Sequence, residues 1–213
     1  MRIALLCGAL ALSSSVLAFN AASANTVIGK AWLNDPTGAG NATIANIPVT
    51  APNATFSELS PLALQAGQNL VPYTLGGWVT SEACGAFITG ASNASAGLDN
   101  TFFEFTGNVT VTTGETFTFQ HDDGLTLVIN GLTVVSAPGP TAAVSTTGTY
   151  TGAPGTFGFT LAYGECCGAP AVLDVNLPLS STPEPSTWAM MGLGFAALGF
   201  AGYRARKTSV SIA

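Results

Sequence analysis

Two adjacent carboxylates, Asp122 and Asp123, are the residues in this sequence best suited to chemistry. Gly124 follows them, and apolar residues alternate with small or polar ones on both sides, so the pair is predicted to lie in a turn between two strands. Carboxylate oxygens suit hard cations such as calcium. Asp and Gly are also ordinary residues of solvated turns. The spacing alone therefore leaves two interpretations open, a cation-binding loop and a turn without a ligand.

The only histidine of the chain, His121, stands directly before this pair. A hydrolytic metal site of the His-Asp type would need further histidine ligands, and a Ser–His–Asp triad would come with a G-x-S-x-G motif, which is absent. We therefore predict no catalytic residues and a protein that is not an enzyme. His121 is expected to be an exposed polar side chain in the loop.

Charge is scarce in this chain. Charged residues make up 8% of its 213 residues, against roughly 25% in an average soluble domain. Between residues 25 and 183, one lysine stands against ten carboxylates, a net charge of −9. Nucleic-acid binding depends on Lys and Arg side chains that displace counterions from phosphates, so this composition excludes it. An apolar content of 47% also argues against intrinsic disorder.

The N-terminus has the three parts of a secretory signal peptide in the right order. Met1-Arg2 supplies a positive start, residues 3–12 an apolar run, and Ala22-Ser23-Ala24 a small-residue cleavage site. We predict a helical signal peptide over residues 1–24. The mature chain then begins at residue 25, outside the cytoplasm.

The C-terminus carries an uncharged, largely apolar run at residues 186–203, and Arg204, Arg206 and Lys207 follow it. A helix of this length extends about 27 Å, close to the roughly 30 Å of a bilayer core. We predict a transmembrane helix at 186–203, a basic cluster that stops transfer and stays cytoplasmic, and a short tail at 208–213. A buried core helix is the alternative, which the glycines of this run disfavour.

Pro183, Glu184 and Pro185 precede this run. The order of motif, apolar span and basic tail over residues 183–207 resembles the PEP-CTERM sorting signal of exported Gram-negative proteins. The resemblance implies recognition by an exosortase, a membrane transpeptidase that cuts near the Pro-Glu-Pro. It also implies the secretion machinery as a partner, a precursor anchored in the inner membrane, and a mature form at the cell surface or in extracellular polysaccharide.

The remaining segment, residues 25–182, is long enough for one domain with a full hydrophobic core. No stretch of it repeats apolar residues at the spacing of an amphipathic helix, whereas alternating patterns are frequent. Asn130-Gly131 predicts a tight hairpin turn. The expected strands cover residues 26–33, 54–64, 108–112, 115–120, 125–129, 132–136, 156–163 and 171–177. Residues 34–52 and 91–100 are expected to be loops.

Residues 102–177 resemble the β-sandwich of the protective-antigen and flocculin (GLEYA-like) type. In that family a strand ending in Asp-Asp leads to a Leu-x-Ile-x-Gly strand and later to a Tyr-x-Glu segment, as here. The resemblance implies an all-β fold, an antiparallel β-sandwich that is jelly-roll-like, here with a signal helix before it and a transmembrane helix after it. Adhesins of the family use the Asp-Asp pair to hold a calcium ion that contacts sugar hydroxyls, and the matching positions are Asp122 and Asp123. Those adhesins add an Asn from a later loop, but residues 164–170 contain Glu165 and no Asn.

Three cysteines, Cys84, Cys166 and Cys167, remain after removal of the signal peptide. In an oxidising compartment a pair of them should form a disulfide. We favour a bridge from Cys84 to one of the two adjacent cysteines, which leaves the third over. A vicinal disulfide between Cys166 and Cys167 is the alternative. Irregular spacing argues against a zinc site.

These observations lead to one functional hypothesis and one alternative. The exported protein is predicted to be a non-enzymatic carbohydrate-binding or adhesive module, with calcium as its candidate cofactor. The alternative is a purely structural protein of the exopolysaccharide or biofilm matrix without a ligand. The aromatic residues Trp32, Tyr73 and Trp78 could stack on sugar rings, although burial is the commoner fate of such side chains.

Overall fold

The computed structural model describes residues 26–82, 85–175 and 177. The predicted signal peptide, the Pro-Glu-Pro motif, the apolar run at 186–203 and Cys84 all lie outside these residues. Within the described part of the chain, no helix is long and apolar enough to cross a membrane.

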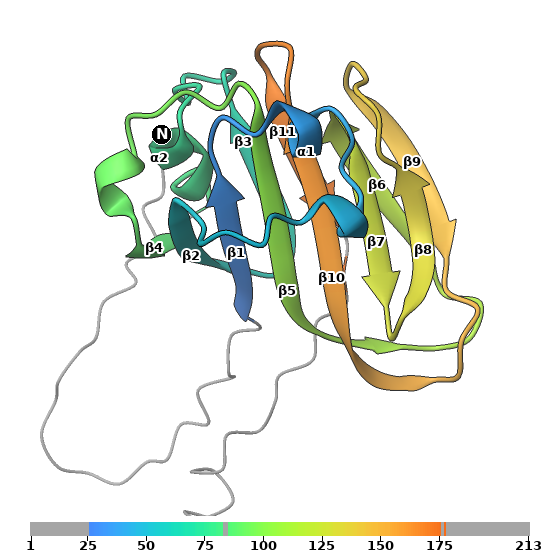
Figure 1. Ribbon diagram of the computed structural model, residues 1–213. Coiled ribbons are helices and arrows are strands. Elements are labelled where there is room, and N and C mark those ends of the chain that lie inside the picture. The colour runs from blue at the N-terminus through green and yellow to red at the C-terminus, as the bar shows by residue number, and fades with distance from the viewer. Residues whose placement is uncertain (1–25, 83–84, 176, 178–213) are drawn as a thin grey trace, which may run out of the picture. The chain divides into compact units, whose positions relative to one another are not determined.

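The described residues form two antiparallel sheets that pack as a sandwich (Figure 1). The seven-stranded sheet has the order β4 (Ala86–Thr89), β2 (Ala54–Leu59), β1 (Thr26–Trp32), β5 (Thr101–Val111), β10 (Gly155–Glu165), β7 (Leu125–Ile129) and β8 (Leu132–Ala137). The four-stranded sheet has the order β3 (Leu62–Ala66), β11 (Ala171–Val175), β6 (Thr116–Asp122) and β9 (Val144–Thr149). Short helical turns, α1 (Pro36–Ala39), η1 (Ile44–Asn46), α2 (Leu75–Val79) and η2 (Ala91–Asn93), lie in the connections. The predicted antiparallel β-sandwich is confirmed.

The strand boundaries differ from the prediction in three places. The single strand expected at 54–64 is two strands, β2 and β3, which belong to different sheets and are separated at Ser60-Pro61. Proline has no N–H to donate to a neighbouring strand, which accounts for the end of the strand at this position. Strand β5 begins at Thr101, before the start of the strand expected at 108–112. Strands β4 and β9 were not predicted, because β4 has only four residues and β9 is rich in Thr and Ser, so neither shows a clear apolar alternation.

Stacked aromatic rings fill the centre of the sandwich. Trp78 stacks on Tyr163 with ring centroids 5.3 Å apart and on Phe103 at the same separation. All three side chains are fully buried. Trp78 is therefore a core residue and not a surface platform for sugars. Tyr163 belongs to β10, two residues before that strand ends at Glu165, so the core stack holds the end of β10 in place.

The only lysine among the described residues, Lys30, lies on β1, between β2 and β5. Its Nζ donates to the carboxylate of Glu104 on β5 at 2.8 Å. The pair neutralises one acid in the middle of the seven-stranded sheet. Within the described residues, no basic side chain remains for the other carboxylates.

Candidate metal and carbohydrate site

The Asp122–Asp123 pair lies at the turn that joins β6 to β7, one strand from each sheet. Asp123 has a positive φ of 38°, which an Asp tolerates better than most residues. A Cβ on Gly124 would lie 2.1 Å from the Pro138 carbonyl oxygen, so only glycine fits this position. The Gly124 carbonyl accepts a hydrogen bond from the Gly164 N–H of β10 at 2.9 Å. The turn is therefore fastened to the neighbouring strand.

The prediction that His121 is an exposed loop side chain is wrong. His121 is fully buried on β6. Its Nδ1 lies 2.5 Å from the Asp123 carbonyl oxygen, and its Nε2 lies 2.7 Å from Thr146 Oγ1. The alternation of Phe117 and Phe119 on the inward face of β6 continues to position 121, which is the signal that could have predicted this burial. His121 shapes the turn.

The carboxylate of Asp123 faces inward and is only 3% exposed. Its Oδ1 accepts from the Thr141 N–H at 3.2 Å, and its Oδ2 accepts from the Cys166 N–H at 2.7 Å. Burial raises the pKa of Asp123, the two backbone hydrogen bonds oppose that shift, and the negative charges of Asp122 and Asp99 add to it. The charged form of this carboxyl thus lacks a compensating positive charge.

Glu165, at the end of β10, joins the same group. It is fully buried, and its two oxygens accept from the hydroxyls of Tyr73 at 2.6 Å and Tyr163 at 2.8 Å. Tyr163 also donates to the Asp122 carbonyl, and Tyr73 contacts Asp99 at 3.2 Å. Each tyrosine has one proton for two acceptors, so a protonated Glu165 would supply one of the two protons that the four contacts still lack. Consistently, burial raises the pKa of Glu165 to about 9, against the effect of the tyrosine hydrogen bonds and with help from Asp123 and Asp122.

Four carboxyls therefore gather at one end of the sandwich, those of Asp99, Asp122, Asp123 and Glu165. Sequence motifs predicted the aspartate pair as a site, and Glu165 was recognised within residues 164–170. Nothing in the sequence indicated that Asp99 and Tyr73 would join them, because both come from irregular segments without a motif. The lysine of the described region is already paired with Glu104, so no lysine or arginine among the described residues balances this end.

Cys166 and Cys167 follow Glu165 directly and form a vicinal disulfide. This is the alternative pairing of the sequence analysis; Cys84 lies outside the described residues, so the favoured bridge from Cys84 to one of these two cysteines stays a prediction. Ligand atoms of Asp123, Cys166 and Cys167 lie within 4.8 Å of one another. Sulfurs joined in a disulfide are not thiolate ligands, so in this state the group offers oxygen donors and suits a hard cation better than zinc.

The pairing can be checked by peptide mapping of the exported protein under non-reducing conditions. We expect Cys166 and Cys167 in one peptide that is two hydrogens lighter than its reduced form. Reduction should change the thermal unfolding midpoint little, because a bond between neighbouring residues closes almost no loop. A cross-linked peptide that contains Cys84 and one of the other two cysteines would contradict this pairing.

A protein-family model of the PEP-CTERM protein-sorting motif matches residues 181–207. This chain carries a PEP-CTERM sorting motif. The match confirms the motif read from Pro183, Glu184 and Pro185 with its basic tail, and it marks the chain as an exported, exosortase-processed protein of the cell surface.

Solved structures similar to the chain include PA14 domains. The PA14 sugar-binding domain from an RTX adhesin is 18% identical, covering 71% of this chain and 87% of that one, with a TM-score of 0.49. The PA14 domain of the antifreeze protein MpAFP is 16% identical, covering 75% and 83%, also with a TM-score of 0.49. The GH31 α-xylosidase from Xanthomonas citri is 12% identical and covers 76% of this chain but 14% of the enzyme, with a TM-score of 0.36. No curated protein matches the sequence.

Proposed function

We propose that this PEP-CTERM protein is a non-enzymatic carbohydrate-binding module, and that Asp122 and Asp123 hold a calcium ion which contacts sugar hydroxyls. One observation carries the proposal. Four carboxyls meet at one end of a domain in which, among the described residues, the lysine is already paired with another acid. Buried carboxylates are costly without a balancing charge. A divalent cation would supply that charge.

The donor set fits calcium. Oxygen atoms are the ligands calcium prefers, and it accepts irregular geometry. Each oxygen of Asp123 accepts one backbone hydrogen bond, which leaves a second lone pair on each. Asp122 uses one oxygen for the Asp123 N–H. When bound, the ion supplies coordination positions for hydroxyl groups, while Asp99 adds negative charge near Asp123.

The order of segments in the precursor is part of the proposal. We assign residues 1–24 to a signal peptide, 25–182 to the β-sandwich domain, 183–207 to the sorting signal with a transmembrane helix at 186–203, and 208–213 to a tail. The precursor is then held in the inner membrane before exosortase processing. Extracellular polysaccharide is the partner that the exported domain meets at the cell surface.

Calorimetric titration with calcium tests the metal site. The exported protein should give a saturable binding heat, and a variant with Asp122→Ala and Asp123→Ala should give none. A glycan array read with calcium and then with chelator should lose its signals in chelator. The matched control carries Glu115→Gln and Asp174→Asn, which remove two carboxylates from other strands or turns and should leave calcium binding intact.

Two outcomes would reject the proposal. Equal heats for the native protein and the Asp122, Asp123 double variant would remove the metal site. Calcium binding without any glycan signal sensitive to chelator would favour the structural matrix protein, in which the acidic end serves stability alone.

A further inference from the structure

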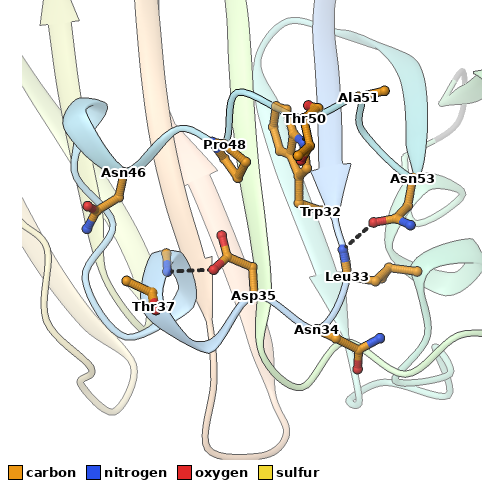
Figure 2. Close-up of a pocket in the computed structure, with 11 residues that line it drawn as sticks. Trp32, Leu33, Asn34, Asp35, Thr37, Asn46, Pro48, Thr50, Ala51 and Asn53 are labelled. Atoms are coloured by element: carbon orange, nitrogen blue, oxygen red, sulfur yellow. Dashed lines mark hydrogen bonds between the residues drawn. The ribbon is translucent and has the colours of Figure 1, made fainter.

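The structure contains a pocket of about 460 Å³ (Figure 2). It is formed by the end of β1 and the connection from β1 to β2, which crosses in front of the seven-stranded sheet (Figure 1). Its lining comprises Trp32, Leu33, Asn34, Asp35, Thr37, Gly38, Asn46, Pro48, Thr50, Ala51 and Asn53. None of the four carboxyl residues of the acidic end belongs to this lining.

The walls of the pocket are fixed by hydrogen bonds. Trp32 Nε1 donates to the Thr50 carbonyl at 2.9 Å, and Asn53 Oδ1 accepts from the Leu33 N–H at 2.8 Å. These bonds tie the two ends of the connection together. Behind the pocket, Trp32 packs at 6.0 Å on Phe102 in a small apolar cluster of its own, separate from the main core. A pocket built this way exists before any ligand arrives, which lowers the entropy cost of binding.

Several polar groups on the lining have no partner among the described residues. Asp35 uses Oδ1 to accept from the Gly38 N–H at 3.1 Å, which leaves Oδ2. Asn53 uses its oxygen and keeps its amide N–H₂, and Asn46 uses its amide N–H₂ for the Asn41 carbonyl and keeps its oxygen. Figure 2 shows the Asp35 carboxylate pointing into the space between Pro48 and the α1 turn. Donors and acceptors therefore surround an apolar wall of Trp32, Leu33 and Pro48.

This combination defines a class of ligand. Sugar hydroxyls both donate and accept, so a carboxylate next to amides can bind neighbouring hydroxyls, while the C–H face of a pyranose contacts apolar side chains. The volume falls in the range of small-molecule sites. An acidic sugar would meet the negative charge of Asp35 with no lysine or arginine of the described residues free to offset it, because Lys30 is paired with Glu104.

We propose that this pocket is a second carbohydrate subsite that binds a neutral pyranose unit without calcium. The inference extends the proposed function, since it gives the domain two places to hold one polysaccharide. It stands on different residues and needs no metal, so the two proposals can fail separately.

The test is retardation of the exported protein in gels that contain a neutral glucan, mannan or galactan, or the polyuronate alginate, all in chelator. We expect retardation by at least one neutral polymer and none by alginate. Asp35→Asn keeps an acceptor for the Gly38 N–H but removes the charge, and should weaken the affinity about tenfold. Ala51→Trp should abolish retardation by obstructing the pocket. Ala45→Trp is the matched control, because Ala45 is an exposed alanine of the same connection that does not line the pocket.

The outcomes separate the two sites. The variant with Asp122→Ala and Asp123→Ala should keep its retardation in chelator if the pocket acts alone. Absence of retardation by every neutral polymer in chelator would overturn the second subsite and leave calcium-dependent binding unaffected. Equal retardation of the Ala51→Trp and Ala45→Trp variants, both with the native unfolding temperature, would overturn it as well. Retardation in chelator without any calcium effect would instead reject the metal site and support the pocket.

Discussion

Replacing Glu58 by glutamine should raise the free energy of unfolding by about 4 kcal/mol at pH 8 and leave it almost unchanged at pH 4. Glu58 is fully buried on β2, and neither of its carboxylate oxygens has a hydrogen-bond partner in the part of the chain that the structure describes. Burial raises its pKa to about 8, and the negative charge of Glu82 adds to the shift. Glutamine has a similar shape and never ionises, so it removes the cost of a buried charge.

The direction follows from the two protonation states. The native pKa of about 8 lies above the ordinary glutamate pKa of 4.5, so the folded chain holds this proton more tightly than the unfolded chain. The resulting stability is fully present below pH 4.5 and is lost as the pH rises toward 8, by about 1.4 kcal/mol for each pH unit.

Urea unfolding at a series of pH values would measure this effect. The Glu58→Gln variant should show a shallower fall in stability with pH than the native protein. Glu115→Gln serves as a control, because Glu115 caps a surface turn through the Thr112 N–H and should not alter the slope. Parallel pH profiles for the native protein and the Glu58 variant would show that Glu58 has a partner in solution.

Changing Pro183, Glu184 and Pro185 to alanine should abolish maturation of the C-terminus. The sorting-motif match covers residues 181–207, and an exosortase that reads this motif would no longer find its substrate. The variant should accumulate in the inner membrane with its C-terminal residues present, as should the native protein in a host without exosortase. Intact mass of membrane and medium fractions gives the measurement.

The control for this prediction carries Thr208→Ala and Ser209→Ala, which lie just beyond the matched residues. It should be processed like the native chain. If the variant without Pro-Glu-Pro reached the medium with the same C-terminal mass as the native protein, sorting would not depend on this motif.

The fold class could be predicted because several strands alternate between buried and more exposed residues over part or all of their length. Phe117 and Phe119 point into the sandwich, and residues 125–129 and 156–163 lie in β7 and β10 as expected. The edge strands β4 and β9 were not predicted because most of their residues are exposed. Their sequences therefore show no alternation between a buried and an exposed face. The break between β2 and β3 at Pro61 was not predicted because the apolar pattern continues across it from one strand into the next.

The candidate site was predictable only in part. Asp122, Asp123 and Glu165 stand in recognisable motifs, but their surroundings depend on chain segments that meet only in the folded protein. Tyr73 follows β3, and Asp99 precedes β5. The prediction of an exposed His121 was wrong because its acidic neighbours suggested a solvated loop. The alternation along β6 already indicated that this side chain faces the core.

The ion pair between Lys30 and Glu104 affects how readily proteases outside the cell can cleave this protein. Proteases that cut after lysine or arginine find one such bond between residues 26 and 177. That bond lies in β1, hydrogen-bonded on both sides to β2 and β5, and its lysine is held by Glu104. Trypsin applied to intact cells should therefore strip lysine-rich surface proteins and leave this domain whole.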